Sequence, residues 1–387
     1  MTDSSPRVLL FGASGYTGRL TALAMARRGL RPVLVGRSRS KLEAVVGEIL
    51  SAKSVAGGLE IADVTDPSSL AAVVRAGDVL VSTVGPFVTM GEPAITTAIN
   101  KGALAYIDST GEPPFIRRVF EEWGPQADRA GVALVTAFGY DYVPGNLAAA
   151  LAFRQAVDAG VSPVRVDVGY FVKGTMSMSG GTAASAAGAL TMPHFEFTRA
   201  HLSTVRGGNS WRSFDIDGTQ WDGLSVGATE HFTVPRLSPT ITEVNTYLGW
   251  AGKNTRHVSR LSGATSLVAK IPGFDRALGA LSSRTAPAPG DGPSEETRSQ
   301  ARTLAVAETF DGVGRQLSRV VVEGPSPYDL TAELLAWAAD ESLAGHLTRT
   351  GALGPADAFG GPGATVAASI EAFAAGCASL DLSPTAT

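Results

Sequence analysis

Short apolar runs alternate with helix-forming segments through the first 140 residues, and this alternation constrains the fold more than any other feature. The apolar runs occupy residues 7–11, 32–35, 59–64, 78–83, 103–109 and 132–137. One intervening helix is marked at both ends, because Asp66 is a typical N-cap, Pro67 suits the first helical position and Gly77 favours a stop. Strands separated by single helices form parallel sheets. The segment therefore predicts an α/β domain built on a doubly wound parallel sheet.

The pattern changes after residue 145, where candidate strands are joined by short turns. Residues 164–172 alternate in part, Asp217 and Gly218 form a typical hairpin turn, and residues 303–324 hold two strands around a glycine-rich turn. We expect an antiparallel or mixed sheet here, in a second domain of different character.

Two further segments complete the predicted organisation. Residues 282–300 are rich in proline, glycine and serine, which predicts an exposed loop. From residue 328 onward the chain is predicted to be helical, with an alanine-rich final helix near residues 364–376. The predicted segments are 1–145, 146–325 and 326–387.

The segment FGASGYTGRL follows the first apolar run and opens the first helix. Its three glycines suit a tight turn, the close approach of a pyrophosphate, and close packing of helix on sheet. The helix N-terminus adds N–H groups and a partial positive charge, although a purely structural turn is the alternative. We predict that the phosphate loop consists of Gly12, Ser14, Gly15, Tyr16, Thr17 and Gly18.

The second apolar run ends in VLVGRSRSKL, which lacks the carboxylate that usually binds the adenosine ribose of NAD. Arg37 stands there instead, and arginine attracts the 2′-phosphate that a carboxylate would repel. A solvated basic stretch is the alternative, but cations are disfavoured where a helix starts. We predict NADPH as the cofactor, held by Arg37, Ser38 and Lys41, with Arg39 as a secondary candidate.

Two more strand ends face the same crevice, because ligands of open α/β sheets lie at the carboxyl ends of the strands. Asp63 and Val64 follow the third run and are predicted to contact adenine, although Asp63 could equally cap a turn. The residues after the fourth run could run beside the nicotinamide ribose or form a structural turn. They are Thr83, Val84, Gly85 and Pro86.

Composition excludes several classes of protein. A net charge of −4 predicts no binding of nucleic acid, and the single cysteine, Cys377, excludes an internal disulfide or a cysteine zinc site. No apolar run approaches the roughly 18 residues of a membrane span, and the first run is too short for a signal peptide. The five histidines lack metal-ligand spacing. We expect a cytoplasmic protein without a metal.

Eight motifs, in order along the chain, carry a resemblance to a known family. They are GASGYTGRL, LVGRSRSKL, STVGPF with GEP, YIDSTGE, FGYDYVPGN, SGGTAASA, GPSEE and VEGPSPYDLTA. The chain resembles the saccharopine dehydrogenase-like oxidoreductases, in particular the branch with the trans-acting enoyl reductases of actinobacterial lipid and polyketide pathways. The resemblance implies a Rossmann domain, an inserted mixed α/β second domain, and C-terminal helices that return to the first domain. It also implies an NADPH-dependent enzyme of secondary metabolism.

The residues after the sixth run are the main candidates for chemistry. The family's FDSVP stands here as YDYVP, which adds hydroxyl groups at the junction of the two predicted domains, where pockets are common. We predict Tyr140 as a hydrogen-bond donor to the substrate, with Asp141 orienting it or acting as an ion. The alternative is that Tyr140 packs at a hinge and Asp141 caps the next helix.

Other polar residues have two interpretations. Asp108, Ser109, Thr110 and Glu112 either line the nicotinamide side or cap a helix, and capping is slightly favoured. His194 faces a cavity or packs, with packing favoured. The segment SGGTAAS, residues 179–185, is a helix start that either points at the substrate or is merely rich in small residues.

Aromatic residues of the second domain bear on the substrate. The segment MPHFEF and the side chains of Phe171, Trp211, Trp221 and Tyr247 are candidate cavity lining, although each alone is more typical of a core. An apolar cavity favours reduction of an activated C=C bond in a polyketide- or lipid-like enoyl substrate. The alternatives are an imine or ketone reductase of the saccharopine dehydrogenase type, and a non-catalytic NADP(H)-binding sensor or scaffold. A homodimer is compatible with the second domain.

Overall fold

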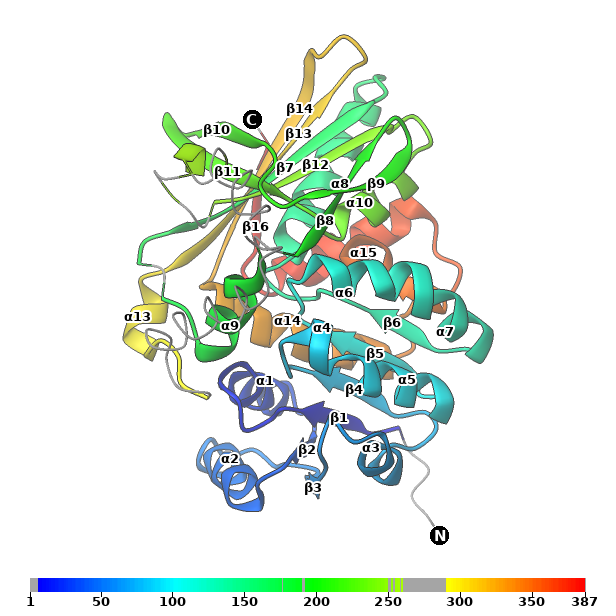
Figure 1. Ribbon diagram of the computed structural model, residues 1–387, viewed down its shortest axis with the longest axis vertical. Coiled ribbons are helices and arrows are strands. Elements are labelled where there is room, and N and C mark those ends of the chain that lie inside the picture. The colour runs from blue at the N-terminus through cyan, green and yellow to red at the C-terminus, as the bar shows by residue number, and fades with distance from the viewer. Residues whose placement is uncertain are drawn as a thin grey trace, which may run out of the picture.

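The computed structural model describes residues 6–175, 177–189, 192–249, 252, 255–257, 259 and 290–386. Two sheets dominate it (Figure 1), a parallel sheet below and a larger mixed sheet above, with α9 and α13 at one side between them. This arrangement confirms the predicted fold class. None of the described helices is both long and apolar enough to cross a membrane.

The first sheet has seven parallel strands in the order β15-β6-β5-β4-β1-β2-β3. In chain order they are β1 (Val8–Phe11), β2 (Val33–Gly36), β3 (Gly58–Ile61), β4 (Val79–Ser82), β5 (Ala105–Asp108), β6 (Ala133–Val135) and β15 (Gly351–Leu353). The chain crosses from β3 back past β1 to β4, so the strand order reverses between β1 and β4. This is where a doubly wound fold opens its ligand crevice.

Helices cover both faces of this sheet. They are α1 (Tyr16–Arg27), α2 (Arg39–Ser51), α3 (Pro67–Val73), α4 (Phe87–Met90), α5 (Glu92–Lys101), α6 (Pro113–Arg118), a π-helical turn at Val119–Trp123, and α7 (Gly124–Ala130). Along β1, Val8 and Leu10 belong to one buried cluster and Leu9 and Phe11 to the other. A strand buried on both faces reads as a continuous apolar run, which is why five of the six runs were recognisable, whereas β3 is a partly exposed edge strand. Asp66 caps α3 as predicted, accepting from the N–H of Ser68.

The second sheet mixes parallel and antiparallel pairs. Its strands are β7 (Arg165–Lys173), β8 (Pro193–Thr198), β9 (His201–Arg206), β10 (Trp211–Ile216), β11 (Thr219–Val226), β12 (Glu243–Leu248), β13 (Arg302–Phe310), β14 (Gln316–Gly324) and β16 (Ser383–Ala386). The predicted hairpin turn joins β10 to β11, with φ values of 52° at Asp217 and 76° at Gly218. The long helix α8 (Val143–Asp158) packs on one face and leads directly from the first sheet into the second.

The shorter helices of this region include α9 (Gly180–Ala189), α10 (Glu230–Thr233) and α13 (Glu295–Ser299). The prediction of a loop over residues 282–300 was wrong for α13, because Ser294 caps that helix by accepting from the N–H of Thr297. Residues 282–289 of the same prediction lie outside the described residues.

The C-terminal segment was predicted to be helical, and it contains the helices α14 (Pro327–Leu343) and α15 (Val366–Ala378). Helix α14 packs on α1 and so returns to the first domain. The segment also contains β15, which adds a strand to the first sheet, and β16, which adds one to the second. A uniformly helical segment was therefore wrong, because both short strands depend on distant partners rather than on their own sequence.

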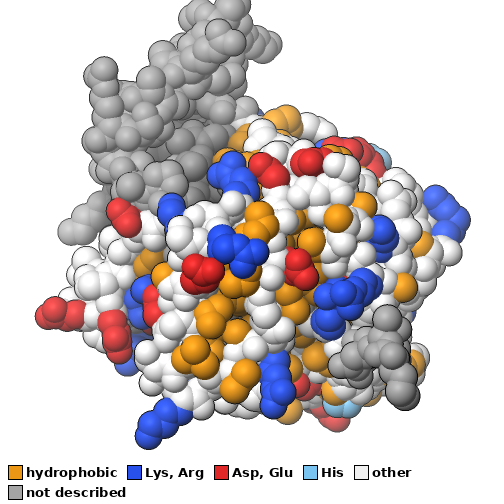
Figure 2. Space-filling view, turned by 90° about the horizontal axis from the view of Figure 1, so that it is seen from below, with side chains coloured by type: hydrophobic (Ala, Val, Ile, Leu, Met, Phe, Trp, Pro, Cys, Tyr) orange, Lys and Arg blue, Asp and Glu red, His pale blue; other side chains and the backbone are white. Residues whose placement is uncertain are grey.

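Charges of both signs are interspersed with apolar side chains on the face of the molecule that Figure 2 shows. This mixture agrees with the small net charge of the chain. The face shown carries no field of a single sign that would attract a polyanion.

Candidate active site

The glycine loop between β1 and α1 is shaped by close contacts of its backbone. Gly12 has a φ of +78°, and a Cβ there would lie 2.8 Å from Val84 Cγ2. A Cβ on Gly18 would lie 2.1 Å from the carbonyl oxygen of Gly12. The first glycine therefore permits the turn, and the third lets the helix approach the strand, as the sequence predicts.

The N-terminus of α1 is open to an anion. Gly15 is the N-cap and provides no side-chain cap, and the first turn contains no acidic residue. The side chain of Tyr16 is engaged elsewhere, since its hydroxyl donates to the carbonyl oxygen of Pro293 at 2.5 Å and its ring packs edge-on against Tyr328. At this turn a phosphate would meet backbone N–H groups and the side chain of Thr17, which lines the adjacent cleft.

A basic, hydroxyl-bearing cluster lies where β2 ends and α2 begins. The Arg37 side chain is 73% exposed, and its Nη1 lies 3.9 Å from Asp63 Oδ2. Ser38 is the N-cap of α2 but makes no side-chain capping bond, and the first turn again lacks an acidic residue. Lys41 is exposed on the same turn. These side chains are accessible from solvent, and their contact with a phosphate stays a prediction.

Asp63 and Val64 follow β3 beside this cluster. Asp63 Oδ1 accepts hydrogen bonds from the Thr65 backbone N–H at 2.9 Å and from its hydroxyl at 2.7 Å, and these bonds lower the pKa of Asp63. Val64 is buried. The turn-capping role of Asp63 is thus present in the structure, and adenine contact stays a prediction.

The turn after β4 lies against the glycine loop. Thr83 donates from Oγ1 to the carbonyl oxygen of Phe11 at 3.0 Å, and Thr83 and Gly85 both line the cleft. Pro86 is the N-cap of α4. This turn is therefore in place to contact the half of a dinucleotide that extends beyond the phosphate loop.

The polar residues after β5 support the backbone without a side-chain cap on the next helix, α6, and Ser109 and Glu112 also line the cleft. Buried Asp108 accepts from the N–H groups of Thr110 and Ala137 and from the Thr136 hydroxyl, and burial raises its pKa to about 6. Glu112 accepts from the N–H groups of Phe87 (2.9 Å) and Val88 (2.8 Å). Asp108 thereby ties β5 to β6, and Glu112 holds the turn after β4.

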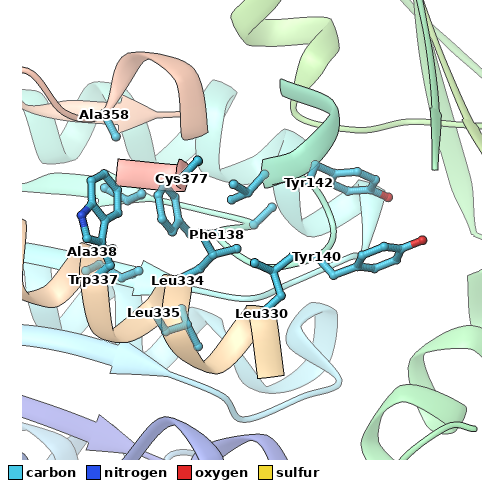
Figure 3. Packing of buried hydrophobic residues seen from close by; sticks show 14 of the residues in the cluster. Phe138, Tyr140, Tyr142, Leu330, Leu334, Leu335, Trp337, Ala338, Ala358 and Cys377 are labelled. Carbon is cyan, nitrogen blue, oxygen red and sulfur yellow. The ribbon is translucent and has the colours of Figure 1, made fainter. Parts of the chain in front are cut away.

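Tyr140, Asp141 and Tyr142 follow β6 in sequence, and two of these side chains have a buried polar atom without a partner among the described residues. Figure 3 shows Tyr140 and Tyr142 extending in the same direction, away from the packed residues Phe138, Leu334 and Trp337. The Tyr140 hydroxyl and Asp141 Oδ1 are buried and have no hydrogen-bond partner among the described residues. Burial raises the pKa of Asp141 to about 7, and it keeps the pKa of Tyr140 well above its ordinary value. Unpaired buried polar atoms are costly, so they point to a ligand that supplies the partner.

A cleft between the two sheets brings these elements together. Its first chamber, of about 850 Å³, is lined by Thr17, Thr83 and Gly85 of the first domain and by Val226 and Leu248 of the second. Its second chamber, of about 660 Å³, is lined by Tyr140, Val172, Met178, Tyr328 and Thr331. Thr17, Ser109, Asp141 and Thr182 line both chambers.

The ionisable Asp, Glu, Lys and Arg side chains among the described residues of this cleft are all acidic. Among the described residues that line the two chambers there is no Lys and no Arg, whereas Asp141 and Glu112 are both present. Such a lining suits a neutral substrate and offers no partner for a carboxylate.

Comparisons with known proteins agree with this geometry. Residues 8–135 match the saccharopine dehydrogenase NADP binding domain. A trans-acting enoyl reductase of Mycobacterium bovis is 27% identical over 371 residues, which cover 85% of this chain and 87% of the relative. A Mycobacterium tuberculosis protein, provisionally named a trans-acting enoyl reductase, is 29% identical over 364 residues, covering 85% and 86%. The apo saccharopine dehydrogenase (L-Glu forming) of Saccharomyces cerevisiae has a TM-score of 0.60 at 15% identity, covering 99% of this chain and 100% of that one.

The chain is an NADP-dependent oxidoreductase whose residues 8–135 match the saccharopine dehydrogenase NADP binding domain. It uses NADPH, as predicted, and the open α1 N-terminus and the Arg37 cluster fit that cofactor. The likeness to the yeast enzyme shows the shared fold, including the second sheet.

The predicted aromatic lining of this oxidoreductase was largely wrong. Phe171, Trp221 and Tyr247 pack with Phe214 on the face of the second sheet that points away from α8. Trp211 is 38% exposed and stacks under Arg256. Alternating residues of one strand point to opposite faces, so Tyr170 and Phe171 could not both face the cleft.

Part of MPHFEF does reach the cleft. Met192 and His194 line the first chamber, and His194 Nδ1 accepts from the N–H of Gly227 at 3.1 Å. The start of α9 also lies there, since Ser179, Gly181, Thr182 and Ser185 line the same chamber.

Two residues behind the cleft were missed. Tyr170 donates its hydroxyl to the carbonyl oxygen of Tyr142 at 2.9 Å and is also hydrogen-bonded to buried Glu230. Burial raises the pKa of Glu230 to about 8. No local pattern could have joined three residues that lie 28 and 60 positions apart.

Proposed function

We propose that this NADPH-dependent oxidoreductase reduces the activated C=C bond of a polyketide- or lipid-like enoyl substrate. The observation that carries the proposal is the cleft lining, which contains no Lys or Arg among its described residues and does contain the unpaired Tyr140 hydroxyl. A saccharopine-type substrate carries several carboxylates, which are bound in proteins by cations. The names of the relatives also support enoyl reduction.

The cofactor, when bound, supplies the hydride. The protein binds the reactants and supplies one proton to the substrate. Thr83 and Gly85, at the end of β4, line the same chamber as Asp141 and would hold the reacting half of the cofactor there. Addition of hydride to the β-carbon moves negative charge to the carbonyl oxygen of the substrate. The Tyr140 hydroxyl donates a hydrogen bond to this oxygen, in a site where burial keeps the tyrosine protonated.

Asp141 completes the reaction by giving a proton to the α-carbon. With a pKa of about 7 it is substantially protonated at neutral pH, unlike an ordinary carboxyl. It then regains the proton from solvent through the cleft. The carbon–carbon double bond is replaced by two C–H bonds, one from hydride and one from the proton.

The test follows NADPH consumption at 340 nm with three types of substrate, which range from neutral to anionic. They are a 2-enoyl thioester, a simple ketone, and a 2-oxo dicarboxylate supplied with an amino acid. We expect turnover with the thioester at a kcat/KM at least tenfold above the other two. Turnover confined to the oxo acid with amine would move the enzyme to the imine reductases. NADPH binding without turnover on any of them would favour the non-catalytic role.

A further inference from the structure

The second chamber has a continuation that leads away from the reaction centre. A smaller surface cavity shares Val172, Ser177, Pro327 and Tyr328 with it. This outer cavity extends to Thr175, Pro293 and Arg298, between the end of β7, α13 and the start of α14. The two spaces are therefore adjacent, and together, named here the passage, they extend from Tyr140 toward α13.

The passage is separate from the path of the cofactor. The turn after β4, with Thr83 and Gly85, lines the first chamber and is not part of the described lining of the second. Thr17, Ser109 and Asp141 stand between the two chambers and line both. A cofactor that runs from the α1 N-terminus to the β4 turn thus leaves the second chamber to another molecule.

The walls of the passage suit an extended, uncharged chain. Val172, Met178 and Pro327 are apolar, and Tyr328 contributes a ring whose hydroxyl already donates to Thr182 at 2.9 Å. Arg298, in the outer cavity, is paired with Asp329 at 2.7 Å and with the Tyr16 hydroxyl at 2.9 Å. Its charge is therefore already compensated by the protein.

We propose that the second chamber and the outer cavity form the acyl channel of the enzyme, with Val172 and Met178 setting the chain length that fits. This inference rests on the proposed function, because it takes the substrate to be an enoyl chain. The enoyl carbonyl lies at the Tyr140 hydroxyl, at the inner end, and the hydrocarbon chain extends past Val172 and Tyr328 toward α13. A bulky side chain at position 172 obstructs the passage while leaving the first chamber open.

The test compares Val172→Phe with Val226→Phe, the same substitution in the first chamber. Each variant is assayed with trans-2-decenoyl and trans-2-butenoyl N-acetylcysteamine thioesters, after its melting temperature and NADPH affinity are checked. We expect Val172→Phe to lower kcat/KM for the long substrate at least tenfold more than for the short one. Val226→Phe should show no such length dependence. Met178→Trp replaces Val172→Phe if the latter does not fold.

A binding measurement keeps the channel testable apart from the reaction. Calorimetry with the saturated decanoyl thioester and NADP⁺-loaded protein needs no turnover, so it distinguishes failure of the channel from failure of enoyl reduction. Binding to the wild type that weakens at least tenfold in Val172→Phe supports the channel. The inference is overturned if the wild type does not bind the decanoyl chain, if Val172→Phe affects both lengths equally, or if Val226→Phe produces the length dependence.

Discussion

The turn after β1 and the turn after β6 lie at the same edge of the same sheet but are built in opposite ways. The first consists of glycines, lacks a side-chain cap and leaves the backbone of the α1 N-terminus open. The second places Tyr140, Asp141 and Tyr142 in sequence, with both tyrosines and the Oδ1 atom of Asp141 buried. We propose that the first turn binds the cofactor through its backbone and that the second acts on the substrate through its side chains.

This difference teaches why the two turns respond differently to change. Where backbone segments are in close contact there is no room for an added atom. A functional group on a side chain, by contrast, can be removed while the backbone keeps its geometry. Substitutions in the first turn should therefore affect cofactor binding, and substitutions in the second should affect catalysis at unchanged cofactor affinity.

The largest effect on cofactor binding is expected for Gly18→Ala. The new Cβ would lie 2.1 Å from the Gly12 carbonyl oxygen, so the loop has to move. Displacement of a binding group by about 1 Å can cost on the order of 100-fold, and we expect at least this loss of NADPH affinity by fluorescence titration. Gly47→Ala is the control, because a Cβ there meets no atom within 4 Å and the site is in the interior of α2. Unchanged NADPH affinity in Gly18→Ala would contradict the close-packing role.

Tyr140→Phe should lower kcat by on the order of 10²–10³ at unchanged NADPH affinity, because it removes one hydrogen bond to the developing oxyanion. Tyr247→Phe, in the cluster on the far face of the second sheet, should leave kcat unchanged. Steady-state kinetics with an enoyl thioester make the comparison. A wild-type kcat in Tyr140→Phe would leave this tyrosine a packing role only.

Arg37→Asp should change the choice of cofactor rather than the chemistry. It removes charge-assisted hydrogen bonds worth about 1.5–3 kcal/mol each and places a repulsive carboxylate beside the 2′-phosphate. We expect NADPH to lose on the order of 100-fold in affinity relative to NADH. Arg39→Asp, two residues farther along the chain, should have a much smaller effect on the NADPH affinity. Equal losses for NADPH and NADH would show that Arg37 does not contact the phosphate.

The pH dependence of kcat should show the smallest effect, set by Asp141. Its pKa is raised to about 7, so the acid form is present below that pH and is lost above it. We expect kcat to fall about tenfold per pH unit above pH 7. Asp141→Asn should remove this limb together with most of the activity. Glu230→Gln should keep the limb near pH 7, which separates Asp141 from the other buried carboxyl behind the cleft.

The first turn could be predicted from sequence because its function depends on spacing. Gly12, Gly15 and Gly18 follow a buried strand, and Arg37 follows the next one, so local order fixes the positions of both at the ends of their strands. The consecutive apolar runs likewise predicted the first sheet, since strands buried on both faces leave that pattern.

The second turn and the cleft could be predicted only in part. Tyr140 and Asp141 were found from their place after β6, but their burial depends on α14 and on Tyr170 of the second sheet. The faces of β7, β10 and β11 are set by pairing register, which composition does not reveal, so the aromatic lining was misplaced. β15 and β16 were missed because each gains its hydrogen bonds from a strand that is distant in the sequence.

The destination of the hydride tests the central claim most directly. Wild-type enzyme is given NADPH deuterated at the transferred position of C4, together with an enoyl thioester, and the product is analysed by NMR. Enoyl reduction predicts deuterium at the β-carbon of the product and a solvent-derived proton at its α-carbon. Deuterium found on a carbon bonded to nitrogen or oxygen would contradict enoyl reduction.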